Sequence, residues 1–104
     1  MEKYILNEIL NGMEKKSLNK KVFCTTDHLK AQVMRLEAGN SIPPCKMDND
    51  VLFYILSGNG TITVDTETDE INTGCSVVVP HKAESRSIFA KTDLEILAVQ
   101  GLRK

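Results

Sequence analysis

The 104-residue chain has no tryptophan, only two tyrosines and three phenylalanines, and no apolar run long enough to span a bilayer as a helix. So few aromatic rings weaken any case for stacking on single-stranded nucleic acid. A formal net charge of -1 argues against a general polyanion binder, because affinity for a phosphate backbone needs a basic surface. We therefore expect neither nucleic acid nor a membrane as a partner.

The cysteines show no pairing pattern. Cys24, Cys45 and Cys75 are odd in number and have no CxxC spacing. Residues Met1 to Gly12 lack the continuous apolar core and small-residue cleavage site of a secretory leader. We therefore expect free thiols and a cytoplasmic protein. The length predicts a single domain.

From Lys20 onward, short β-branched and apolar runs alternate with turn residues, which is typical of an all-β sandwich or barrel. The absence of an intervening long helix favours an antiparallel jelly roll. The segment Ser57-Gly58-Asn59-Gly60 predicts a hairpin, because Gly and Asn tolerate positive φ. Val77-Val78-Val79 predicts a strand covered on both faces. The expected strands are 21–25, 29–36, 51–56, 61–65, 70–72, 76–79, 86–90 and 94–99, with an acidic turn at 66–69 and an extended piece around Pro43-Pro44.

The N-terminal stretch has a different pattern. Leu6, Ile9, Leu10 and Met13 follow helical spacing, and Gly12 is a stop signal. A helix this short is marginal alone, so it needs contact with its own barrel or with a partner. We expect an N-terminal arm over residues 1–20 and a barrel domain over residues 21–104.

Two stretches of the chain have glycines at characteristic intervals. The first runs from Gly39 through Cys45-Lys46-Met47 and Val51 to Gly58, and the second runs from Gly74 through Pro80 to Ser85. Over residues 22–99 this spacing resembles that of a small single-domain member of the cupin superfamily. The resemblance implies an antiparallel jelly-roll (cupin) β-barrel with a short N-terminal helix or arm.

Where cupins carry three histidines and a glutamate, this chain has Cys45, Met47, Val51 and Ser85. The resemblance implies that these four side chains converge at the mouth of the barrel. Val offers no donor and neutral Ser is a poor one, so we expect no bound metal and no cofactor. Cys45 and Met47 alone remain as soft donors that favour Cu(I), although a small buried hydrophobe and a gap-filling Met are the simpler interpretation.

Three further residues are candidates for the ligand site. Phe53 lies in the strand that follows Val51. Arg35 shares a strand face with Val33; if that face lines the cavity, Arg35 is a partner for a carboxylate or phosphate, and otherwise it lies on an outer surface. His81 follows Pro80 and is either an acid or base at the pocket rim or a solvated turn residue.

Three functions are compatible with these residues. The first is a small-molecule-binding barrel without the usual metal ligands, acting as a sensor or accessory protein. The second is an isomerase or oxygenase that uses unconventional groups or a soft metal such as copper. The third is a structural dimer with a filled barrel. The resemblance also implies a homodimer, in which the apolar arm around Tyr4, Ile5 and Leu6 would be buried.

Overall fold

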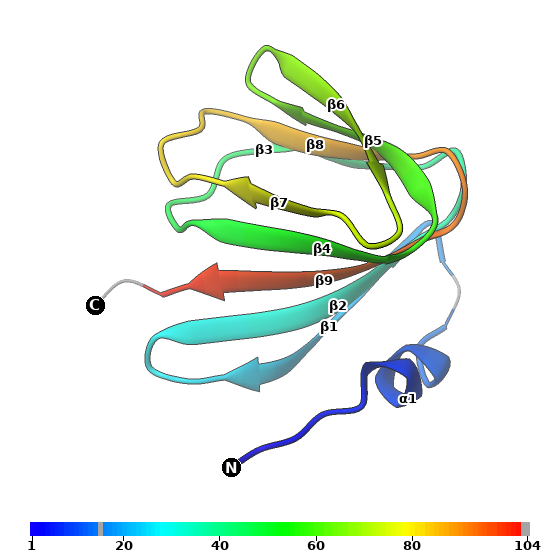
Figure 1. Ribbon diagram of the computed structural model, residues 1–104, viewed down its shortest axis with the longest axis vertical. Coiled ribbons are helices and arrows are strands. Elements are labelled where there is room, and N and C mark those ends of the chain that lie inside the picture. Colours follow the sequence, from blue (N-terminus) through cyan, green and yellow to red (C-terminus); the bar gives the residue numbers. More distant parts are fainter. Residues whose placement is uncertain (15, 103–104) are drawn as a thin grey trace.

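The computed structural model describes residues 1–14 and 16–102. These residues form two antiparallel sheets and a short helix (Figure 1). One sheet has the strand order β1-β2-β9-β4-β7, and the other has the order β3-β8-β5-β6. The elements are α1 (Leu6–Asn11), β1 (Leu18–Thr25), β2 (Leu29–Leu36), β3 (Ser41–Cys45), β4 (Val51–Ser57), β5 (Asn59–Val64), β6 (Glu67–Asn72), β7 (Ser76–Val79), β8 (Arg86–Ala90) and β9 (Leu94–Gly101).

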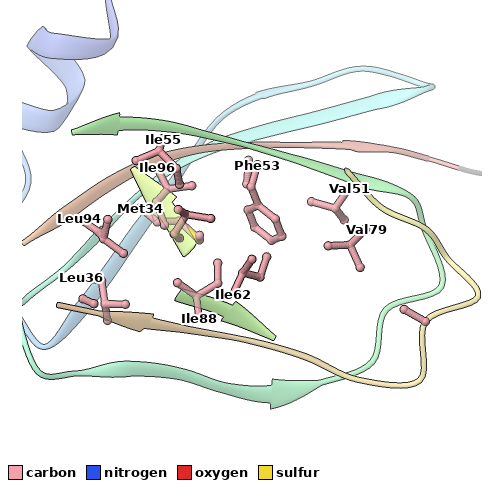
Figure 2. Close-up of a cluster of buried hydrophobic side chains, with 14 residues drawn as sticks. Met34, Leu36, Val51, Phe53, Ile55, Ile62, Val79, Ile88, Leu94 and Ile96 are labelled. Carbon is pink, nitrogen blue, oxygen red and sulfur yellow. The ribbon is translucent and has the colours of Figure 1, made fainter. Parts of the chain in front are cut away.

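The core lies in the space between the two sheets. In β4, Val51, Phe53 and Ile55 are buried, whereas Leu52 and Tyr54 are exposed, which is the period of two that a half-buried strand requires. Figure 2 shows side chains from both sheets meeting there, with Val51 and Val79 at one end and Leu36 and Leu94 towards the other. The predicted all-β jelly-roll arrangement is confirmed.

Helix α1 packs on the outer face of the five-stranded sheet. Leu10 and Val33 form a buried cluster with Met13, and Leu6 and Ile9 pack against it. The helix ends before Gly12, as the sequence predicts. The apolar face of α1 is therefore buried against its own chain.

The predicted hairpin at Ser57-Gly58-Asn59-Gly60 is wrong. Strand β4 pairs with β7 and β9, whereas β5 pairs with β6 and β8 in the other sheet. Gly58 has φ 95°, and a Cβ there would lie 2.0 Å from the carbonyl oxygen of Asp93. Gly58 therefore lies where the chain turns from β4 in the five-stranded sheet to β5 in the four-stranded sheet.

Two other local expectations need correction. Val78 is 63% exposed, because β7 is an edge strand and only its inner face, with Val79, is covered. The acidic turn is shorter than expected, since Val64 pairs directly with Glu67 and leaves a two-residue turn at Asp65 and Thr66. Asp65 has φ 53°, a conformation that Asp tolerates in tight hairpins.

Candidate functional site

Six residues from the two sheets bound one end of the inter-sheet space, which we name the Val51 end. In the five-stranded sheet, Val51 of β4 pairs with Gln100 of β9 on one side and with Val79 of β7 on the other. In the four-stranded sheet, Arg86 of β8 pairs with Cys45 of β3 and Val64 of β5. Because directly paired residues point to the same face of a sheet, each set of three forms one row across its sheet.

Arg86 brings a positive charge into this largely apolar place. Its guanidinium carbon lies 5.2 Å from the centroid of the Phe53 ring, and its Nη2 donates to the sulfur of Met47. None of the ion pairs among residues 1–14 and 16–102 involves Arg86. A cation over an aromatic face gains more when water is partly excluded, as it is for this half-buried side chain.

Arg86 is not among the predicted site residues, although the sequence contains a signal for it. Ile88 and Ala90 of β8 are buried, so alternation along the strand assigns Arg86 to the same inner face. An arginine in phase with two buried apolar residues of one strand predicts a charge that faces the core.

Four of the predicted site residues do meet at the Val51 end. Val51 is 2% exposed and Phe53 is 5% exposed, and both belong to the core. Met47 is half-buried and packs against the same core cluster from the segment between β3 and β4. Cys45 is exposed at the end of β3, opposite Arg86. The end is thus apolar inside and has a thiol at its rim.

Ser85 has a different environment. It lies just before β8, where its backbone N–H donates to Asp65 Oδ1 at 3.0 Å and its carbonyl accepts from the Asp65 N–H at 2.9 Å. The first residue of β8 in phase with the buried Ile88 is Arg86. Arg86 therefore stands at the inner position where the motif spacing predicts Ser85.

Arg35 lies outside the inter-sheet space, on the same face as Val33. Its Nη1 donates to the carbonyl oxygen of Leu10 at 2.8 Å and to that of Met13 at 3.3 Å. Its Nη2 lies 3.3 Å from Glu95 Oε2. The outer-surface alternative therefore describes Arg35: it binds carbonyl groups at the C-terminal end of α1 and lines no part of the Val51 end.

His81 links two loops beside the Val51 end. Its backbone N–H donates to Asp50 Oδ1 at 2.7 Å, and its Nδ1 lies 3.0 Å from the same oxygen. Lys46 Nζ lies 3.7 Å from Glu84 Oε2, which joins the same two loops a second time. The segment that carries Met47 is therefore tied to the segment between β7 and β8.

The donor set of this end does not suit a divalent metal. Among the described residues, no three His, Cys, Asp or Glu side chains gather in a way that could hold an ion. Cys45 and Met47 are soft donors, but the sulfur of Met47 accepts from the Arg86 guanidinium. A positive charge at that sulfur opposes the binding of any cation there.

A cavity of about 540 Å³ opens beside the Val51 end, between the unpaired edges of β6 and β7. Its apolar lining includes Val64 and Val77, which pair with Arg86 and Phe53 respectively. This volume falls in the range of small-molecule pockets. Its polar lining is mostly acidic, because Asp65, Glu67, Asp69 and Glu70 line it together with one lysine, Lys82.

Comparison with known proteins supports the fold. No protein-family model and no curated protein matches the sequence. A cupin superfamily protein from Desulfitobacterium hafniense is 17% identical, with a TM-score of 0.83 over 99% of this chain and 94% of its own. A conserved protein of unknown function from Streptococcus pyogenes is 24% identical, with a TM-score of 0.78 over 88% of this chain and 79% of its own. The chain therefore has the cupin fold.

Enzymes share this fold as well. A variant of salicylate 1,2-dioxygenase from Pseudoaminobacter salicylatoxidans is 18% identical, with a TM-score of 0.78 over 91% of this chain and 30% of its own. Proteins with and without a known activity thus resemble this chain equally in shape, and a fold does not choose among functions. No helix in the described part of the chain is long and apolar enough to cross a membrane.

Proposed function

We propose that this chain is a cupin barrel that binds a small organic molecule at the Val51 end and does so without a metal. The observation that carries the proposal is the contact of the Arg86 guanidinium with the Phe53 ring and the Met47 sulfur. Met47 and Val51 stand at positions where the motif resemblance implies the metal ligands of other cupins. A polar group that is fixed within an apolar lining is the usual composition of a small-molecule site. The adjacent cavity of about 540 Å³ supplies space on the flank of these side chains.

The role that follows from ligand binding without a metal is that of a sensor or accessory protein.

All three cysteines are free, which supports the proposal of a reducing compartment such as the cytoplasm. Free thiols at Cys24, Cys45 and Cys75 persist where the glutathione pool keeps them reduced.

The alternative is an isomerase or oxygenase that uses unconventional groups or copper. Cys45 and Met47 favour it, because they lie at the same end and are the soft donors that Cu(I) prefers. The contact between Arg86 and Met47 argues against it, since the guanidinium would have to leave before an ion could bind. We therefore place ligand binding first.

A combined metal and ligand measurement tests the proposal. Protein purified without chelator should contain far less than one equivalent of Fe, Mn, Ni, Zn or Cu by elemental analysis. In a thermal-shift screen of small organic molecules, a ligand at a hundred times its Kd should stabilise the native state by about 2.7 kcal/mol, which raises Tm by several degrees. Val79→Phe, which fills the Val51 end, should abolish that shift.

Three outcomes would count against this function. Near-stoichiometric iron, manganese, nickel or zinc would contradict it. Stoichiometric copper that is lost in Met47→Leu would instead support the enzyme alternative. A screen in which no molecule shifts Tm would favour a filled, purely structural barrel.

We also propose that the chain forms a homodimer. The outer face of the five-stranded sheet exposes Leu52, Tyr54 and Val78 on the neighbouring strands β4 and β7. A contiguous apolar surface of this kind often marks an interface. The N-terminal arm contributes less apolar surface than the sequence suggests, because Leu6, Ile9 and Leu10 pack against the five-stranded sheet of the same chain. Tyr4 and Ile5 remain exposed.

A further inference from the structure

The charge at the Val51 end identifies the class of ligand, on the premise that the proposed binding function holds. We infer that the ligand is a small organic monocarboxylate. Its carboxylate binds the Arg86 guanidinium, and its apolar body takes the space that the Met47 side chain fills in this structure.

The first step concerns the partner of Arg86. A guanidinium has five N–H donors in a planar fork that fits a carboxylate with two parallel hydrogen bonds. In this structure its recorded contacts are the Phe53 ring and the sulfur of Met47, which is a weak acceptor. No carboxylate in the described part of the chain forms an ion pair with Arg86. An anionic ligand would supply a charged acceptor that the described residues do not give Arg86.

The second step concerns Met47. Its side chain is unbranched, flexible and half-buried, and it comes from the segment between β3 and β4. An alkyl chain of similar shape would keep the apolar contact with the core cluster when the thioether swings out. On Arg86, the ligand carboxylate then replaces the sulfur of Met47, which is a weaker acceptor. This exchange favours displacement of the Met47 side chain.

The third step concerns the number of charges. Val64 pairs with Arg86, and Val51 and Val79 are buried in the facing sheet, so this end is lined by apolar surface. The buried amide at this end, Gln100, is 7% exposed and neutral, and its Oε1 accepts from Asn49 Nδ2 at 3.4 Å. One guanidinium compensates one negative charge, and a second charge would stay dehydrated and unpaired. A monocarboxylate fits, and a phosphate dianion does not.

The route to Arg86 also follows from charge. The side cavity between β6 and β7 has Glu67 and Asp69 among four acidic lining residues, which repel an anion. At the rim beside β3, Lys46 directly precedes Met47 and is paired with Glu84 Oε2 at 3.7 Å, so this side has less excess negative charge than the cavity. We therefore assign entry to the side of Cys45 and Met47.

Three probes with the same six-carbon chain test the inference on the full-length protein: hexanoate, 1-hexanol and hexylamine. Binding is followed by the methyl resonances of ¹³C-methionine, with the Met47 signal assigned by its loss in Met47→Leu. Hexanoate should shift the Met47 methyl and bind roughly 10- to 100-fold more tightly than 1-hexanol, as expected for a hydrogen-bonded charge. Hexylamine should bind most weakly.

Two variants distinguish binding by Arg86 from a general effect of the protein's positive charge. Arg86→Met should weaken hexanoate by about the same 10- to 100-fold factor and leave 1-hexanol unchanged. Lys20→Met removes one positive charge from an exposed position on β1 and should leave all three affinities unchanged. If Arg86→Met does not fold, Arg86→Lys keeps the charge without the planar fork and should still weaken hexanoate several-fold.

The outcomes distinguish this inference from the proposed function. Equal binding of hexanoate and 1-hexanol, unaffected by Arg86→Met, would overturn the monocarboxylate assignment and leave small-molecule binding intact. If none of the probes moved the Met47 methyl, the assignment would also fall. The thermal-shift screen would then decide separately whether the Val51 end binds any molecule.

Discussion

At the scale of single residues, Gly60 shows how closely β5 and β8 approach. A Cβ at Gly60 would lie 2.0 Å from the carbonyl oxygen of Phe89, a backbone atom that cannot rotate away. Gly60→Ala should therefore lower the free energy of unfolding by about 1–3 kcal/mol or more, as overpacking does. Urea denaturation measures the change.

Gly101 supplies the matched control. It is also a strand glycine, but among the described residues no atom outside its two chain neighbours lies within 4 Å of the position its Cβ would take. Gly101→Ala should change the free energy of unfolding by no more than about 0.5 kcal/mol. Equal effects of the two substitutions would show that backbone entropy, and not the contact with Phe89, determines the cost.

The residues of the Val51 end were only partly predictable. Motif spacing placed Cys45, Met47 and Val51 close together, because glycines at fixed intervals set strand register. The same spacing pointed to Ser85, whereas the inner position belongs to Arg86, one residue later. The motif gives the number of residues between two positions. It does not give the direction of a side chain that follows an irregular segment, such as the one before β8.

Arg35 illustrates a different limit. Strand β2 has apolar residues on both faces, since Val33 contacts α1 and Met34 lies in the core. When both faces of a strand are covered, alternation does not say which one is inside. The face that carries Arg35 is decided by where α1 packs, and the sequence of β2 does not contain that information.

At the scale of elements, Arg35 joins α1 to the five-stranded sheet. Arg35→Met removes its hydrogen bonds to the carbonyls of Leu10 and Met13 and its contact with Glu95. Because hydrogen bonds to charged groups contribute about 1.5–3 kcal/mol, docking of α1 should weaken by about that amount. Hydrogen exchange should then accelerate at the amides of α1 more than at those of β5.

Glu95→Gln is the control for that change. It removes only the ion pair and keeps both carbonyl contacts of Arg35, so its effect should stay below about 1 kcal/mol. Unchanged exchange at α1 in Arg35→Met would mean that the apolar contact of Leu10 with Val33 holds the helix without help from the arginine.

Elements were otherwise predicted well from local patterns. Each expected strand is present, and α1 ends at the predicted glycine. The error at Gly58 arose because a glycine-rich turn specifies that the chain reverses or bends, but not with which strand the next segment pairs. Pairing of β5 with β8 depends on contacts far away in the sequence.

At the scale of the whole molecule, the apolar outer face of the five-stranded sheet predicts a dimer. Light scattering at micromolar concentration should give twice the monomer mass. Val78→Lys combined with Leu52→Lys should give monomers, since two charges would be buried without partners. Phe89→Lys is the control, because Phe89 is 41% exposed on the other sheet and should not affect the dimer.

A monomer at every micromolar concentration would contradict the dimer. Deletion of residues 1–5 tests the arm separately, because Tyr4 and Ile5 are the apolar arm residues that remain exposed. If that deletion alone gave monomers, the interface would lie at the arm and not at the sheet.

The position of β9 has a consequence for biosynthesis. It runs between β2 and β4 (Figure 1). Within the described residues, β2 pairs otherwise only with β1, and β4 only with β7. A nascent chain that has not yet released Leu94–Gly101 from the ribosome therefore holds two separate strand pairs with open edges. The five-stranded sheet closes only after synthesis has passed Gly101, so until then those edges are open to pairing with other chains.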